Sequence, residues 1–234
     1  MGFQVPGFPT PLLRSRKRIL SQHFKYYSQL TATNKKIFEH RVQEFISRKQ
    51  FIPRDLERVT EEMRVLIAAC AVQLTFGYPN VFLSHFKRIL IYPNDYYSTI
   101  NKTFHKGEVN PKLRAIVISW HHFVSGYVDY SDGINLGLHE MTHALHLENR
   151  IFNHEYNFID RQELIKWHKL SQEEIKKLSD GQDHFFRNYA KTNAEEFLAI
   201  AVENFFEKSV EFKKELPELY KTLSVLLNQD PLKN

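Results

Sequence analysis

The chain has 234 residues, 42% of them hydrophobic and 14% aromatic, which excludes a disordered protein and suits one sizeable core. A formal charge of +5 is too small to indicate a nucleic-acid-binding protein, and the longest uninterrupted apolar run, Val65 to Val72, is far below the ~20 residues that cross a bilayer. The single cysteine, Cys70, excludes an internal disulfide and is expected to be a buried small hydrophobe in a cytoplasmic protein.

The N-terminal region raises two questions, one about export and one about anions. Pro6 and Pro9 interrupt the stretch that would have to be continuously apolar in a signal peptide, so we expect no export signal. The dense basic cluster from Arg14 to Arg18 either contacts phosphate or an anionic surface, or is the solvated start of a helix. We favour the solvated helix and therefore expect no nucleic-acid partner and no membrane association.

The first 90 residues are predicted to form a mostly helical N-terminal part. Apolar residues recur with helical spacing from about Thr33 to Lys49, and a second helix is predicted from Thr60 to Leu74 because glutamates suit its first turn. A turn at Gly77 to Asn80 follows. The short β-branched and aromatic run from Ile89 to Tyr92 is predicted to be a strand.

Residues 91–234 are predicted to complete the same domain as its catalytic part. The run from Leu113 to Trp120 is the clearest strand, because its apolar residues are too continuous for a half-exposed strand. A loop is expected from Gly126 to Gly133, and Asn135 is suited to cap a helix from Leu136 to about Asn149. Ser171 and Glu174 have the spacing of a capping box at the start of a further helix.

Two more helices complete the predicted chain. One begins near Thr192 or Asn193 and continues to Ser209, and another spans Pro217 to Gln229. The whole chain, 1–234, is therefore predicted to be a single α+β domain, mainly helical, with a small sheet.

The segment GLHEMTHALHL, Gly137 to Leu147, has the spacing of a metal site. On a helix, His139 and His143 lie ~40° apart in azimuth and ~6 Å apart along the axis, so both imidazoles can reach one ion. Glu140 lies ~100° from His139; it cannot share the ion comfortably but can reach a water on it, as in H-E-x-x-H hydrolases. His146 is ~10 Å further along the axis than His139, and we interpret it as lying outside the ligand set.

A buried helix that carries histidines by chance is the alternative interpretation, because H-E-x-x-H occurs in many unrelated proteins. Leu138, Met141 and Leu145 indicate that this helix is largely buried. Histidines and a glutamate within a buried helix need polar partners or a metal ion. This requirement favours the metal site.

A third ligand is expected from the later helix. Glu196 and Glu203 are seven residues apart, so they lie on nearly one helical face with the small Ala199 between them. We assign Glu196 as the metal ligand and Glu203 as the acceptor for the N–H of a ligand histidine. The alternative is a pair of solvated glutamates on an exposed stripe. A site of this kind leaves a fourth position open for water.

An ordered series of segments resembles the Mlc titration factor A family of zinc-dependent peptidases. The resemblance is carried by IAACA at Ile67 to Ala71, IYP at Ile91 to Pro93, ISW at Ile118 to Trp120, DGINLGLHEMTHAL at Asp132 to Leu145 and YAKTNAEEFLAIAVENFF at Tyr189 to Phe206. It implies a gluzincin-like, zincin-type domain, similar to the catalytic domain of anthrax lethal factor. It also implies one zinc ion per chain, held by His139, His143 and Glu196, with Glu140 as the catalytic glutamate.

The activity implied by this resemblance is that of a zinc peptidase, aminopeptidase-like, in which Glu140 acts as the general base on a zinc-activated water. Tyr189 would donate its phenol hydrogen to the oxyanion, or would be a buried structural residue. A peptide substrate could pair with the strand at Ala115 to Ser119 if that strand lies at the edge of the sheet. A characterised relative is linked to a glucose-responsive repressor, so the alternative is a regulator that sequesters a transcription factor around a structural zinc.

Overall fold

The computed structural model describes residues 12–98, 102–129 and 132–233. Pro6 and Pro9, on which the expected absence of an export signal depends, lie outside this part of the chain. None of the helices in the described residues has the length and apolar character needed to cross a membrane. The fold is mainly helical with a small mixed sheet, as predicted.

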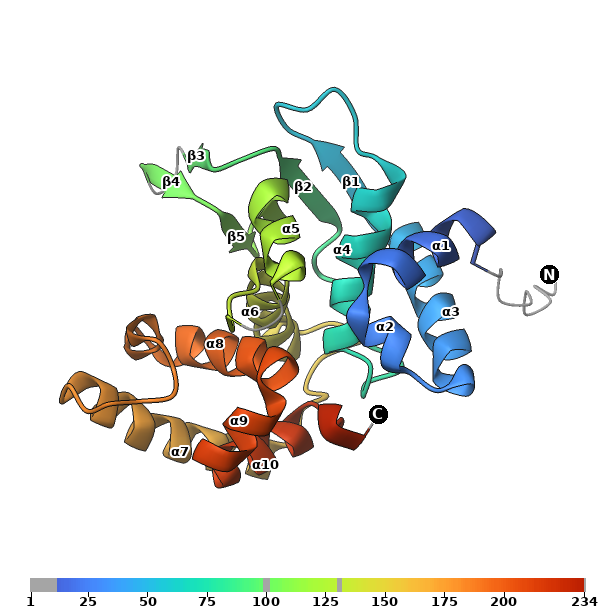
Figure 1. The fold of residues 1–234 in the computed structure, drawn as a ribbon. Coiled ribbons are helices and arrows are strands. Elements are labelled where there is room, and N and C mark those ends of the chain that lie inside the picture. Colours follow the sequence, from blue (N-terminus) through green and yellow to red (C-terminus); the bar gives the residue numbers. More distant parts are fainter. Residues whose placement is uncertain (1–11, 99–101, 130–131, 234) are drawn as a thin grey trace.

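The helices of the described residues fall into an N-terminal and a C-terminal group. They are α1 Arg14–His23, α2 Lys25–Gln29, α3 Ala32–Arg48, α4 Glu61–Leu74, α5 Trp120–Val128, α6 Leu136–Arg150, α7 Arg161–Ser179, α8 Ala194–Glu207, α9 Ser209–Glu215 and α10 Pro217–Leu226, with short 3₁₀ turns at Asn188–Lys191 (η1) and Pro231–Lys233 (η2). Figure 1 shows α1 to α3 on one side of the molecule and α7 to α10 on the other, with α4 and α6 between them.

The main sheet has four strands in the order β1-β2-β6-β5. Strands β1 Gln50–Pro53, β2 Arg88–Tyr92 and β6 Ala115–Ser119 are parallel, and β5 Gly107–Asn110 pairs antiparallel with β6. Strands β3 Tyr96–Ser98 and β4 Thr103–His105 form a separate hairpin-like pair. Because β6 pairs with β2 on one side and β5 on the other, it has no edge for a peptide, and the conditional expectation for Ala115 to Ser119 is wrong. The edge belongs to β5.

Local signals in the sequence located the starts of several helices. Thr60, Asn135 and Asn193 each accept a hydrogen bond from the backbone N–H three residues later, and helices α4, α6 and α8 follow them. The basic cluster at Arg14 to Arg18 is the start of α1, as we expected. Part of it is paired, since Arg16 bonds to Glu61.

Two local predictions are wrong. Ser171 does not cap a helix: it is fully buried within α7, where its hydroxyl donates to the carbonyl of His168. Helix α7 begins ten residues earlier, where the side chain of Asp160 accepts two backbone N–H groups. The expected loop at Gly126 to Gly133 begins too early, because α5 continues to Val128.

The buried helix α4 positions the first turn of α6. All side chains from Val65 to Leu74 are buried, and α4 packs against α1, α3 and α6. At Gly137, an added Cβ would lie 3.0 Å from the Cys70 sulfur and 2.6 Å from the Phe123 ring, so this glycine permits the close approach. Cys70 is buried as predicted, and burial raises the pKa of its thiol to about 12.

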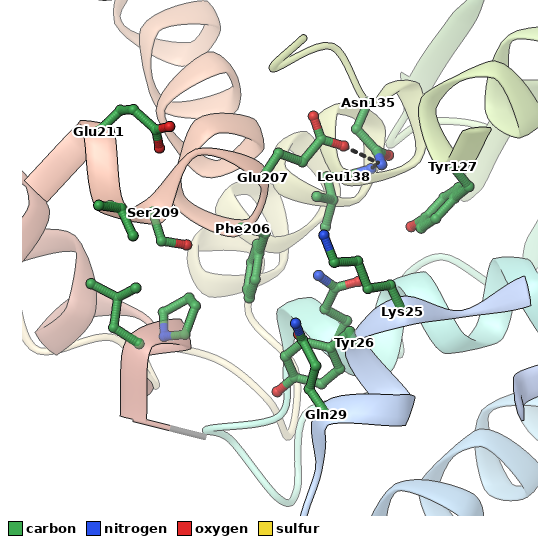
Figure 2. A pocket seen from close by; sticks show the side chains of 14 residues that line it. Lys25, Tyr26, Gln29, Tyr127, Asn135, Leu138, Phe206, Glu207, Ser209 and Glu211 are labelled. Carbon is green, nitrogen blue, oxygen red and sulfur yellow. Dashed lines mark hydrogen bonds between the residues drawn. The ribbon is translucent and has the colours of Figure 1, made fainter. Parts of the chain in front are cut away.

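Asn135 holds the N-terminus of α6 through several hydrogen bonds. Its side-chain oxygen accepts from Leu138 N at 3.0 Å, and its amide donates to Gly126 O and Glu207 Oε1, both at 3.0 Å. Its backbone N–H donates to Glu203 Oε2 at 2.6 Å. Figure 2 shows the Asn135–Glu207 contact on one wall of a cavity of about 200 Å³. The start of α6 is therefore tied to α5 and twice to α8.

The Glu207 carboxyl group retains its proton at neutral pH. Burial raises its pKa to about 8, and the nearby charges of Glu203, Asp132 and Asp129 add to the increase, whereas the hydrogen bond from Asn135 opposes it. One of its oxygens, Oε2, is buried without a hydrogen-bond partner among the described residues. A buried carboxyl group without a nearby cation is expected to favour the neutral form in this way.

We expect this carboxyl group to make the protein less stable as pH rises. In the unfolded chain it ionises near 4.5, but in the folded chain only near 8. Between these values the folded state binds one more proton, so the free energy of unfolding falls with pH, by at most ~1.4 kcal/mol per unit. Urea unfolding of Glu207→Gln and the parent at pH 5 and pH 8 should show a shallower decline in the variant. Parallel declines would contradict the assignment.

Candidate metal centre

Helices α6 and α8 pack against each other and bring the predicted ligands together. His139 and His143 lie on successive turns of α6, and Glu196 lies in the first turn of α8. The start of α8 is fixed because Glu196 N donates to the side chain of Asn193 at 2.8 Å. The three ligand positions are thus set by two capped helix starts, at Asn135 and Asn193.

One ligand atom from each of His139, His143 and Glu196 lies within 4.8 Å of the others. His139 Nε2 is 3.1 Å from Glu196 Oε2, and His143 Nε2 is 3.5 Å from Glu196 Oε1. The two Nε2 atoms are 3.1 Å apart. Each of these side chains is partly buried. The arrangement can hold one metal ion between two imidazole nitrogens and a carboxylate.

The hydrogen bonding around this cluster fits a cation. His139 Nδ1 lies 2.8 Å from Glu203 Oε1, so a neutral ring donates its N–H to Glu203 and directs the lone pair of Nε2 toward the cluster. Glu196 Oε2 is buried without a hydrogen bond of acceptable geometry, although His139 Nε2 is close. Two facing ring nitrogens and an unsatisfied carboxylate oxygen are the donor set that a divalent ion would satisfy.

The charges of the side chains point to the same conclusion. Burial lowers the pKa of His139, but hydrogen bonds to Glu196 and Glu203 outweigh it and raise this pKa to about 10. Burial raises the pKa of Glu196, whereas the two histidines lower it to about 2. The site therefore binds positive charge strongly, and a proton on His139 and a metal ion compete for it.

Glu140 lies outside the three-atom cluster, as predicted from its azimuth. It is 6% exposed and packs against β5, where a Cβ added at Gly107 would lie 2.6 Å from Glu140 Cδ. Burial raises the pKa of its carboxyl group to about 7, against the lowering effect of His139 and His143. A carboxyl group with a pKa near neutrality beside the cluster can accept a proton and return it.

A cavity of about 380 Å³ opens over these residues. Strand β5 lines it with Gly107, Glu108 and Val109, and Tyr189 of η1 lines it together with the start of α8. The Tyr189 side chain is 54% exposed, so it is not a buried core residue. Burial and the charges of Glu196 and Glu140 raise the pKa of its phenol, which therefore keeps its proton as a donor.

His146 also lines this cavity but does not join the three-atom group. Its Nε2 lies 3.4 Å from Nη1 of Arg150. Burial and the charge of Arg150 lower its pKa, so the ring is neutral near pH 7. Its position outside the ligands agrees with the interpretation from the helix axis.

The sequence did not indicate two residues next to the predicted ones. Gly107 makes room for Glu140, and a glycine within a strand does signal a close approach, so this position was recognisable once the strand was known. Arg187 contacts Glu203 through its Nη2 at 2.9 Å, and nothing in the local pattern distinguishes it from a surface arginine. Long-range packing alone identifies it.

Comparison with known proteins gives the family of the chain. Residues 9–227 match the profile described as "Glucose-regulated metallo-peptidase M90". A protein of Synechocystis sp., Uncharacterized protein slr2042, is 27% identical over 245 residues, an alignment that covers 97% of this chain and 88% of that relative. The family match includes both α6 and α8 and confirms the resemblance noted in the sequence. The chain belongs to the M90 family of glucose-regulated metallopeptidases.

Proposed function

We propose that the protein is a zinc-dependent peptidase with one zinc ion held by His139, His143 and Glu196. The observation that carries this proposal is the convergence of their three ligand atoms within 4.8 Å, with the Glu140 carboxyl group beside them. Two imidazoles and one carboxylate form a ligand set that zinc uses in catalytic sites, where a fourth position stays open.

The side chains around the cluster have distinct parts in hydrolysis. When bound, zinc would lower the pKa of a water toward ~7 and polarise the scissile carbonyl. Glu140 takes a proton from the attacking water and returns it to the leaving amine. Tyr189 donates its phenol hydrogen to the developing oxyanion. Glu203 holds the His139 ring through Nδ1 and keeps its Nε2 directed at the ion.

The substrate that fits this site is an extended peptide. Strand β5 pairs with β6 on one side, and among the described residues no strand pairs with its other side. Because Gly107 and Glu108 also line the cavity, a peptide that pairs with this edge would pass over the cluster. Glu108 and Glu195 add carboxylates to the cavity, which supports an aminopeptidase-like preference for a substrate with a free α-amino group.

The expected cytoplasmic location and the single domain over 1–234 stay predictions. So does the alternative function, a regulator that sequesters a transcription factor around a structural zinc. A purely structural site has no need for Glu140, whose buried carboxyl group is retained beside the cluster at the cost of desolvation. This cost favours the peptidase.

We expect the purified protein to bind one zinc ion per chain. His139→Ala, His143→Ala and Glu196→Ala should each lose most of the metal, because each removes one of three ligands. Glu203→Ala should bind zinc ~10 to 100-fold more weakly, because it removes only the acceptor for His139. Metal analysis after dialysis, with a zinc titration of each variant, checks this. Full zinc retention in Glu196→Ala with loss in Glu203→Ala would exchange the roles of the two carboxylates.

Glu140→Gln should keep zinc and thermal stability but lose hydrolysis. Glutamine is nearly isosteric but cannot accept a proton near neutral pH. Loss of a general base typically costs ~100 to 10,000-fold in rate. Chelator-sensitive cleavage of a library of short peptides and aminoacyl substrates provides the measurement. A kcat/KM close to that of the parent, with zinc unchanged, would remove Glu140 from the mechanism and favour a structural metal.

Gly107→Ala should displace the Glu140 carboxyl group without removing the metal. The new Cβ would overlap the Glu140 side chain, which is buried and cannot turn into water, so its oxygens must move within the cavity. We expect a fall of at least ~10-fold in kcat, since small misplacements of a catalytic group are costly. In a Glu140→Gln background the same substitution should cause little further loss. An equal loss in both backgrounds would place the effect elsewhere.

A further inference from the structure

Arg187 connects three segments that surround the candidate metal centre. Its Nη2 donates to Glu203 Oε1 at 2.9 Å and its Nη1 lies 3.3 Å from Glu203 Oε2, so the guanidinium grips the carboxylate with both nitrogens. Nη1 also donates to the carbonyl of Gly133 at 2.9 Å, in the segment before α6. Arg187 itself precedes η1. One side chain therefore ties α8 and the entry to α6 to η1.

The Glu203 carboxylate depends on this contact because it is only 1% exposed. Its other donors are Asn135 N and His139 Nδ1. A buried carboxylate without a cation is costly, and Glu196, Glu140 and Glu207 place further carboxyl groups around it. A two-nitrogen grip by arginine supplies the charge and fixes the plane of the carboxylate. That plane determines where Oε1 meets the His139 ring.

The same arginine also holds the segment that carries Tyr189. The segment η1 is a single 3₁₀ turn that begins directly after Arg187, and Ala190 N donates to Arg187 O at 2.9 Å. So short a turn has little rigidity of its own. With Arg187 anchored to Glu203 and Gly133, the Tyr189 side chain is held at the rim of the cavity although it is half exposed.

We propose that Arg187 is a positioning residue that sets both sides of the site at once. Through Glu203 it orients His139 and so controls metal affinity; through η1 it places Tyr189 and so controls turnover. This inference rests on the proposed function. Its consequence is that one guanidinium, in contact with neither the substrate nor the ion, governs two separable properties.

The affinity half is tested by zinc titration against a chromophoric chelator. Arg187→Gln should weaken zinc binding ~10 to 100-fold. Arg187→Lys should lie between this variant and the parent, because it keeps the charge but loses the two-nitrogen grip. If Glu203 transmits the effect, adding Arg187→Gln to Glu203→Gln should change zinc affinity by less than ~threefold, the signature of coupled residues. An undiminished effect in that background would show that Arg187 does not act through Glu203.

The turnover half is tested at saturating zinc, where affinity no longer matters. Arg187→Gln should lower kcat more than it raises KM, and it should add no further loss to Tyr189→Phe. Additive losses in that pair would overturn the link through η1. Arg16→Gln, which breaks an Arg–Glu pair between α1 and α4, is the matched control and should change neither property.

The outcomes separate this inference from the proposed function. If the parent binds zinc and cleaves peptides while Arg187→Gln and Arg187→Lys match it in both properties, the proposal for Arg187 is wrong and the peptidase stands. If the variants lose thermal stability alone, to the same extent as Arg16→Gln, Arg187 has only a structural role. If the parent itself binds no zinc, both proposals fail.

Discussion

The buried carboxylate of Glu203 is the point at which the fold and the candidate metal centre meet. It accepts the backbone N–H of Asn135 at the start of α6, the Nδ1–H of His139 one turn later, and the guanidinium of Arg187. The first contact sets the position of the helix and the second sets the orientation of a ligand on it. Removing this carboxylate would leave Asn135 N and His139 Nδ1 buried without their acceptor, so the pairing of α6 with α8 and the geometry of the site depend on the same atoms.

Charge explains why the site calls for a cation. Glu140, Glu196, Glu203 and Glu207 all lie where α6 and α8 pack together, and burial opposes the ionised form of the three whose pKa is shifted. Each resolves this conflict differently. Glu207 keeps its proton, Glu196 is ionised against two histidines, and Glu140 has a pKa near 7. A carboxylate that stays ionised beside one that exchanges a proton is the division that ligand and general base require.

The sequence predicted the parts of the site that depend on helical periodicity and local capping. The spacing of His139 and His143, and the caps at Asn135 and Asn193, follow from contacts within four residues. Glu196 was reachable because carboxylates on an apolar helix face need a partner. The wall of the cavity was not, since β5 is recognisable only through its pairing with β6. The capping box at Ser171 failed because the pattern also fits the middle of a helix that Asp160 had already started.

The central claim is that two imidazoles and one carboxylate hold a zinc ion with an open position. X-ray absorption at the zinc edge, on the zinc-loaded protein, tests it most directly. The account predicts four nitrogen or oxygen neighbours at ~2.0 to 2.2 Å and the outer-shell scattering of two imidazole rings. The same spectrum should persist in Glu140→Gln, because that carboxyl group is not a ligand. A fit that requires sulfur at ~2.3 Å, or only one imidazole, would contradict the account.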